Sequence, residues 1–116
     1  KIMEKNQELQ LVCVTTNHYE NATMIARNII SEKLAACCSI VPNVTSFYYW
    51  EEKLTDSNEY LMIIKTTTDK INELENRIQQ LNEYEVPEII AISASSVSQN
   101  YIQWVENLLN VNNNII

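Results

Sequence analysis

Apolar residues recur along the chain with two periods, one typical of strands and the other typical of helices. Residues 9–16, LQLVCVTT, are apolar on both faces and rich in β-branched side chains, which predicts a central strand. A helix follows, because Asn17 and Glu20 have the spacing of a capping box and the next apolar residues fall on one helical face. That face consists of Ala22, Ile25, Ala26, Ile29 and Ile30.

The middle of the chain predicts a hairpin and a second helix. Residues 36–50 and 59–67 have the composition of strands, and the charged, turn-prone EEKLTDSN between them predicts the end of a hairpin. Thr68 or Asp69 can cap a second helix, on which apolar residues repeat at intervals of three and four. These apolar residues are Ile71, Leu74, Ile78 and Leu81.

The last part of the chain predicts one more strand and a third helix. EYEVPEIIAISAS forms the strand, with Pro87 near its start, where a missing N–H is tolerated. Ser96 and Gln99 have capping-box spacing and precede an amphipathic helix. The tail NVNNNII has no periodicity and is either frayed or a short added strand. The apolar face of the third helix consists of Tyr101, Trp104, Val105, Leu108 and Leu109.

This order of elements predicts the fold class. Strand, helix, strand, strand, helix, strand is the α+β, ferredoxin-like (βαββαβ) pattern, an antiparallel sheet with two helices on one face, and a C-terminal helix is added here. With 116 residues and 46% hydrophobic content, the chain can bury a core of its own. No repeat or linker divides it, so we expect residues 1–116 to form a single domain with its core in 9–109.

The predicted hairpin is longer than the helices that could cover it. Its strand at residues 36–50 would span roughly 50 Å, whereas a helix of about thirteen residues covers only about 20 Å. Aromatic side chains left in water on the uncovered half would promote aggregation, so we expect another copy of the chain to bury them in a closed assembly. Alternatively, Pro42 and Asn43 end the strand early and the aromatic residues fold back over the core. The aromatic residues are Phe47, Tyr48, Tyr49 and Trp50.

Charge and composition exclude several partners and cofactors. Fifteen acidic residues against eight basic ones give a net charge of −7, which repels nucleic acid and anionic membrane surfaces. No segment approaches the roughly 18 apolar residues that a membrane helix needs. The chain has no glycine, which excludes glycine-rich phosphate loops, and we expect no nucleotide or organic cofactor.

Three cysteines, Cys13, Cys37 and Cys38, match neither a disulfide framework nor the paired spacing of a zinc site. They favour reduced thiols in a reducing, cytoplasmic location, although the chain begins at Lys1 and a removed leader remains an alternative. Adjacent strand residues point to opposite faces, so Cys37 and Cys38 cannot both bind one metal ion without distortion. We favour packing roles for all three over a metal or redox site.

Charged residues supply two further candidate sites. Glu83, Glu85 and Glu88 surround Tyr84, and such oxygen donors suit magnesium, calcium or acid–base chemistry, although a solvated acidic turn is the simpler interpretation. Lys65 interrupts the apolar strand LMIIKTT. It either reaches a carboxylate or an anionic ligand or lies exposed at an edge.

Catalysis has little support in the sequence. His18 is the only histidine, so neither a histidine pair nor a complete triad can be assembled around it. We favour the interpretation that His18 is a solvated residue near the start of a helix over the interpretation that it is a general base. Glu85 or Glu88 as a general base would lack a visible nucleophile and orienting partner, so we expect no enzymatic activity.

Three segments resemble signature segments of one protein family. VTT at the end of the first strand, IARNIISEKLAACCSIVPNVTSFYYWE and YEVPEIIAI are similar to segments of the CutA divalent-cation tolerance proteins, and the element order agrees over residues 9–109. The resemblance implies a ferredoxin-like subunit in a tight homotrimer whose hairpins pair across subunits, similar to the nitrogen-regulatory signalling trimers. It also implies a role in tolerance of copper and other divalent cations, with no accepted reaction.

The resemblance also implies a ligand site in clefts between subunits. Two departures bear on metal binding: the family's usual His-Pro is replaced by Asn82 and Glu83, and its glycine after WE by Glu52. Cys37 matches the family cysteine and is the best soft ligand, because thiolates prefer copper(I). The alternative function is a signalling or interaction module that binds a small anion or a partner through Lys65. The matching cleft positions are Trp50, Glu59, Lys65, Tyr84, Glu85 and Glu88.

Overall fold

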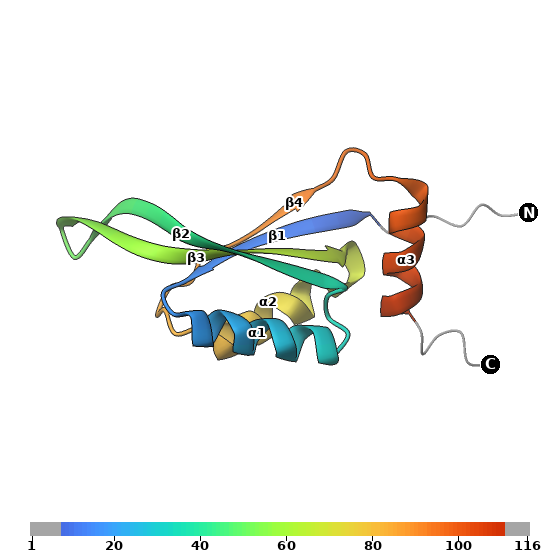
Figure 1. The fold of residues 1–116 in the computed structure, drawn as a ribbon, viewed down its shortest axis with the longest axis horizontal. Helices are drawn as coiled ribbons and strands as arrows, with labels where there is room; N and C mark the ends of the chain where they lie inside the picture. Colours follow the sequence, from blue (N-terminus) through green and yellow to red (C-terminus); the bar gives the residue numbers. More distant parts are fainter. Residues whose placement is uncertain (1–7, 111–116) are drawn as a thin grey trace, which may run out of the picture.

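The computed structural model describes residues 8–110, so the predicted tail strand at 111–116 lies outside the described residues. A four-stranded sheet carries two helices on one face, and a third helix packs at one end (Figure 1). No helix in the described range is long and apolar enough to cross a membrane. The elements are β1 (Leu9–Thr16), α1 (Tyr19–Ser31), β2 (Cys37–Trp50), β3 (Lys53–Thr67), a 3-10 turn (Thr68–Lys70), α2 (Ile71–Leu81), β4 (Ile89–Ser93) and α3 (Gln99–Leu109).

The topology confirms the predicted α+β sheet. The strands lie in the order β2-β3-β1-β4, and each neighbouring pair is antiparallel. The β1–α1–β2 connection therefore crosses over β3, and the β3–α2–β4 connection crosses over β1. Two interleaved crossovers of this kind place α1 and α2 on the same face of the sheet, as Figure 1 shows.

The core has two parts. The main cluster lies between the sheet and the helices α1 and α2, where the predicted apolar faces of both helices are buried or partly buried. A smaller cluster attaches α3 to the end of the sheet through Leu9, Ala36, Ile102, Val105 and Leu109. The largest side chains of the main cluster are Ile25, Ile29, Met62, Ile64, Leu74 and Ile78.

The predicted caps of the first two helices are wrong. The N-cap residue of α1 is His18, whose extended backbone carries no side-chain capping bond. Asn17 does not close a capping box with Glu20, and its buried Oδ1 has no hydrogen-bond partner. The second helix enters through the 3-10 turn Thr68–Lys70 and also lacks a side-chain cap. Burial of the apolar faces against the sheet therefore stabilises these helices without side-chain capping bonds.

The cap of the third helix lies two residues later than predicted. Ser98, not Ser96, is the N-cap residue, and its Oγ accepts a 3.3 Å hydrogen bond from the backbone N–H of Tyr101. The predicted apolar face is wrong at one position, because Trp104 is 48% exposed while the unpredicted Ile102 is buried. The helix is thus rotated relative to the sheet so that Ile102 and Val105 face it.

The hairpin turn also differs from the prediction. β3 begins at Lys53, so most of the predicted charged linker is strand, paired with β2 as far as Trp50 and Lys53. Glu51 and Glu52 alone make the turn, with φ angles of 51° and 66°. Two positive φ angles in a two-residue loop match the twist of the strands, which explains why the pairing extends to the tip despite the polar sequence.

The aromatic half of the hairpin projects beyond the helices (Figure 1). The alternative in which Pro42 and Asn43 end the strand is wrong, because pairing resumes at Val44 after a register shift. Asn43 adopts a φ of 61° there, which is typical of a β-bulge. Beyond it, Phe47 and Tyr49 are 72% and 73% exposed within the single chain.

Candidate functional site

An open cavity of about 820 Å³ lies between the projecting hairpin and the segment that joins α2 to β4, and we call it the hairpin cavity. One wall is aromatic and comes from β2, with Phe47, Tyr48 and Trp50. The other wall is acidic and combines Glu59 of β3 with the segment that joins α2 to β4. This segment contributes Glu83, Tyr84, Glu85 and Glu88.

Buried Asn82 shapes the acidic segment. Its Nδ2 donates a 3.2 Å hydrogen bond to the backbone oxygen of Thr15, at the end of β1. Its Oδ1 accepts a 2.8 Å hydrogen bond from the backbone N–H of Tyr84, which is an Asx turn. Asn82 is therefore a buried side chain that turns the backbone and aims Tyr84 at the cavity.

A second buried asparagine holds the start of the same segment. Asn21 of α1 donates a 2.9 Å hydrogen bond to the backbone oxygen of Leu81, and its Oδ1 accepts from the backbone N–H of Glu83. The hydroxyl of Thr16 donates to the same Oδ1 at 2.5 Å. On the surface, Nδ1 of His18 lies 2.9 Å from Oε1 of Glu83, so the exposed histidine contacts an acidic residue rather than a nucleophile.

Glu59 is the buried centre of the acidic wall. Only 5% of the residue is exposed, and its Oε2 accepts a 2.5 Å hydrogen bond from the Tyr84 hydroxyl. Burial, followed by this hydrogen bond to Glu59, raises the pKa of Tyr84. Burial and the nearby charge of Glu59 also raise the pKa of Glu88. Among the described residues no lysine, arginine or histidine lines the cavity, so its electrostatic character is anionic.

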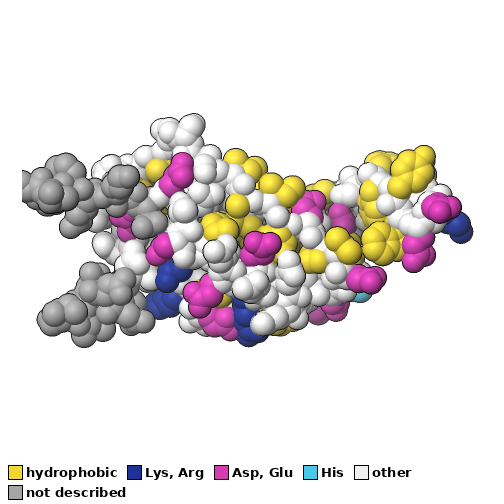
Figure 2. Space-filling view, turned by 180° about the vertical axis from the view of Figure 1, so that it is seen from behind, with side chains coloured by type: hydrophobic (Ala, Val, Ile, Leu, Met, Phe, Trp, Pro, Cys, Tyr) yellow, Lys and Arg dark blue, Asp and Glu magenta, His cyan; other side chains and the backbone are white. Residues whose placement is uncertain are grey.

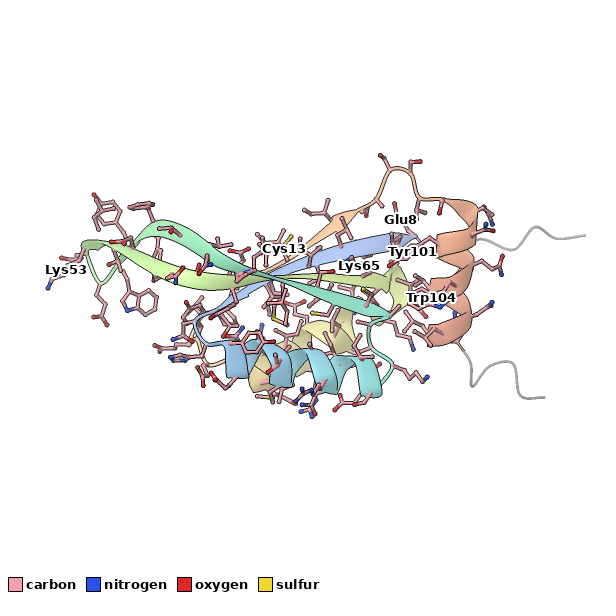
Figure 3. The ribbon with its side chains drawn as sticks, viewed as in Figure 1. Glu8, Cys13, Lys53, Lys65, Tyr101 and Trp104 are labelled. Carbon is pink, nitrogen blue, oxygen red and sulfur yellow. The ribbon has the colours of Figure 1, made fainter. Side chains whose placement is uncertain are left out.

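Lys65 lies at the other end of the sheet, near α3. Its Nζ donates a 2.7 Å hydrogen bond to Oγ of Ser39 and lies 3.8 Å from Sγ of Cys37. Tyr101 of α3 lies at this end as well, and burial followed by the charge of Cys37 raises its pKa. Figure 3 labels Lys65 and Tyr101 at this end and Lys53 at the hairpin tip.

The structure therefore divides the predicted site in two. Lys65 lies six positions after Glu59 on β3, which corresponds to about 20 Å along a strand. Lys65 and Cys37 contact each other but do not line the hairpin cavity. The predicted residues that the cavity brings together are Trp50, Glu59, Tyr84, Glu85 and Glu88.

The two adjacent cysteines face opposite sides of the sheet, as predicted. Cys37 lies beside Lys65, whereas Cys38 packs against the main core near α1. Burial raises the pKa of the Cys38 thiol to about 11. Within residues 8–110, no three histidine, cysteine, aspartate or glutamate side chains are grouped to hold a metal ion.

Sequence reasoning missed several residues of the cavity. Phe47 and Tyr48 were expected only as part of an interface, and the two anchoring asparagines were not expected to position anything. For Asn82 the sequence did contain a usable signal. An asparagine side chain often accepts a hydrogen bond from the backbone N–H two residues later, which forms an Asx turn. Asn21 carried no such signal, because its partners in the acidic segment, Leu81 and Glu83, are distant in the sequence.

Comparison with known proteins identifies the family. The model of the CutA1 divalent ion tolerance protein family matches residues 10–108, almost the whole described chain. The chain belongs to this family. The divalent-cation tolerance protein CutA of Thermus thermophilus is 36% identical over 96 residues, covering 83% of this chain and 93% of that protein. The chloroplastic protein CutA of Arabidopsis thaliana is 39% identical, with 84% of this chain matched to 53% of that longer protein.

Solved structures of CutA1 proteins have the same fold. The crystal structure of divalent ion tolerance protein CutA1 from Ehrlichia chaffeensis superposes with a TM-score of 0.86 at 34% identity. The match covers 90% of this chain and 98% of that one. The family predicted from the three sequence segments is thus confirmed, and the CutA1 fold accounts for the described sheet and helices.

Proposed function

We propose that this CutA1 protein acts in divalent-cation tolerance by binding cations weakly, without catalysing a reaction. The observation that carries the proposal is the hairpin cavity, whose wall holds Glu59, Glu83, Glu85 and Glu88 and no basic side chain among the described residues. A cavity of this charge attracts cations and repels anions, and the net charge of −7 acts in the same direction. The relatives named for divalent-cation tolerance support the same role.

The proposed assembly is a homotrimer. The exposed aromatic half of the hairpin supports it, because Tyr49 is 73% exposed and such a patch favours burial against another copy. Light scattering should give the mass of three chains for the wild type and a smaller mass for Tyr49→Lys. Met24→Lys is the control, since Met24 is 37% exposed on α1, away from the hairpin. A wild-type monomer would contradict the assembly.

Copper is the proposed cargo, and its soft ligand is Cys37, which lies outside the hairpin cavity. The anionic cavity and the negative net charge draw cations to the protein, and the thiol is the group that binds copper(I). Within residues 8–110 no three donor side chains are grouped, so the proposed site takes donors from more than one subunit. The test is calorimetric titration of the reduced protein with copper(I) and a competing chelator. We expect binding that Cys37→Ser abolishes and Cys38→Ser retains. An intact trimer that binds no copper would refute the copper role.

A second candidate function is anion recognition by an interaction module. Lys65 favours it, because within the described residues its ammonium contacts a hydroxyl and a thiol and forms no salt bridge with a carboxylate. Such an anion would bind near α3, away from the hairpin cavity. Lys65→Ala should then abolish sulfate binding and leave copper(I) binding intact, and the opposite result would reject this function.

The proposed location is the cytoplasm. Cys13, Cys37 and Cys38 are all free thiols, which suits a reducing compartment. The relative from Arabidopsis is named chloroplastic, so related chains are placed in other compartments. Fractionation of cells followed by detection of the native chain tests the location, and recovery only with an organelle would contradict it.

A further inference from the structure

We propose that Lys65 weakens the binding of metal cations at the Cys37 thiol, because its ammonium group lies beside the sulfur and repels a second positive charge. The inference rests on the copper binding proposed above for Cys37, and it names the residue that keeps this binding weak. Three features carry it: the register of two strands, the contacts of the ammonium group and the charge around it.

The strand register places the two side chains next to each other. Cys37 on β2 and Lys65 on β3 are directly paired in the antiparallel ladder, so both side chains project from the same face of the sheet. The backbone N–H of Ala36 donates a 2.9 Å hydrogen bond to the carbonyl oxygen of Lys65, which fixes this pairing at the start of β2. The backbone, and not only a side-chain rotamer, therefore keeps the ammonium group near the thiol.

The contacts of the ammonium group direct it towards β2. Nζ of Lys65 lies 3.8 Å from Sγ of Cys37 and donates a 2.7 Å hydrogen bond to Oγ of Ser39, two residues further along the same strand. In the opposite direction Lys65 is paired with Leu11 of β1, whose own partner on β4 is Ile92. The side chains of Leu11 and Ile92 cannot accept a hydrogen bond, so the ammonium group stays beside the sulfur.

The charge near Cys37 is opposite to the charge of the protein as a whole. The net charge is −7, and Figure 2 shows acidic side chains spread along the face that it views. Among residues 8–110, however, Lys65 forms no ion pair with a carboxylate that would neutralise it. Charges a few ångströms apart interact strongly unless water screens them fully, and neither Cys37 nor Lys65 is fully exposed. Repulsion by Lys65 therefore opposes, at the thiol itself, the attraction that the rest of the protein exerts on cations.

Copper(I) titration of the reduced protein with a competing chelator tests the inference. Lys65→Gln removes the charge but keeps a hydrogen-bond donor for Ser39, and we expect it to bind copper(I) about tenfold more tightly than the wild type. Lys65→Arg keeps the charge and should bind as weakly as the wild type. Lys53→Gln is the control for net charge, because Lys53 begins β3 at the hairpin tip, far from Lys65 (Figure 3). Equal affinities of the wild type and Lys65→Gln would overturn the inference and leave the copper role in place.

A second measurement, made without copper, separates this inference from failure of the proposed function. Methanethiosulfonate reagents that carry either a sulfonate or a quaternary ammonium group modify thiols, and tandem mass spectrometry assigns the label to Cys37. Both reagents react with the same thiolate, so the ratio of their rates reports the charge near the sulfur. The ratio of the anionic to the cationic rate should fall about tenfold in Lys65→Gln and stay unchanged in Lys53→Gln.

The two measurements together give distinct outcomes. An unchanged rate ratio in Lys65→Gln, or no labelling of Cys37 by either reagent in the native protein, would overturn the inference. No copper binding by any variant, together with a rate ratio that falls as expected, would refute the copper role and support Lys65 as the barrier to cations at this thiol.

Discussion

The hydroxyl of Tyr84 donates a 2.5 Å hydrogen bond to Oε2 of Glu59, and this contact joins the segment before β4 to strand β3. We expect Tyr84→Phe to lower the free energy of unfolding by about 1–3 kcal/mol, because a buried carboxylate loses its hydrogen-bond donor. Urea denaturation at a fixed protein concentration measures the change.

Tyr48→Phe is the matched control for this prediction. The Tyr48 hydroxyl donates to Oγ of Ser57 at 3.1 Å in an exposed position of the hairpin. Its removal should change the free energy of unfolding by less than about 0.5 kcal/mol. Equal effects of the two tyrosine substitutions would show that the bond to Glu59 adds nothing beyond an exposed contact.

Glu88 should make the protein less stable as the pH rises. Burial and the charge of Glu59 raise its folded-state pKa above the ordinary value of 4.5. The folded state therefore binds more protons than the unfolded state in the window above pH 4.5, and the free energy of unfolding falls as the pH rises through the folded pKa. Denaturation from pH 4 to pH 7 should show a smaller fall for Glu88→Gln, while Glu73→Gln should run parallel to the wild type.

Cys38 should resist alkylation in the folded protein. Its pKa of about 11 against the ordinary 9.0 leaves about 100-fold less thiolate at pH 8, and thiolate is the reactive form. Iodoacetamide labelling followed by peptide mass mapping should therefore be at least that much slower at Cys38 in native protein than in guanidinium-denatured protein. Similar native and denatured rates would contradict the buried position of this thiol.

The hairpin turn should be open to stabilisation. Glu52 has a φ of 66°, a conformation that a Cβ atom makes unfavourable and glycine adopts freely. We expect Glu52→Gly to raise the free energy of unfolding by about 1 kcal/mol, because the strain at Cβ is removed. Glu52→Ala removes the charge but keeps Cβ, so it should change stability little. A gain with alanine as large as that with glycine would assign the effect to charge instead.

The sequence predicted correctly those strands and helices whose buried residues repeat with the period of the element itself. The first strand was predicted at residues 9–16 and lies at Leu9–Thr16, and the apolar faces of α1 and α2 are the faces that pack on the sheet. Prediction failed where a distant partner decides the conformation. Residues 53–58 have a turn-prone sequence, yet they form strand because β2 continues beside them to the tip.

The candidate site divides in the same way. The types of residue in the site could be read from the sequence. The opposite faces of Cys37 and Cys38 could be predicted as well, because side chains alternate between the two faces along any strand. The distance between Lys65 and Glu59 follows from their spacing along β3. Their assignment to two separate sites required the tertiary structure, which packs the segment between α2 and β4 beside Glu59 and leaves Lys65 beside Cys37.

By itself, the sequence determined the order of the elements, the family and the anionic character of the chain, because these depend on residue identity and spacing alone. Only the tertiary structure decided that buried Asn21 and Asn82 hold the acidic segment against β1, and that the hairpin aromatics form the opposite wall of its cavity. The physical reason is that hydrogen bonds between residues 60 or more positions apart leave no periodic trace in the sequence.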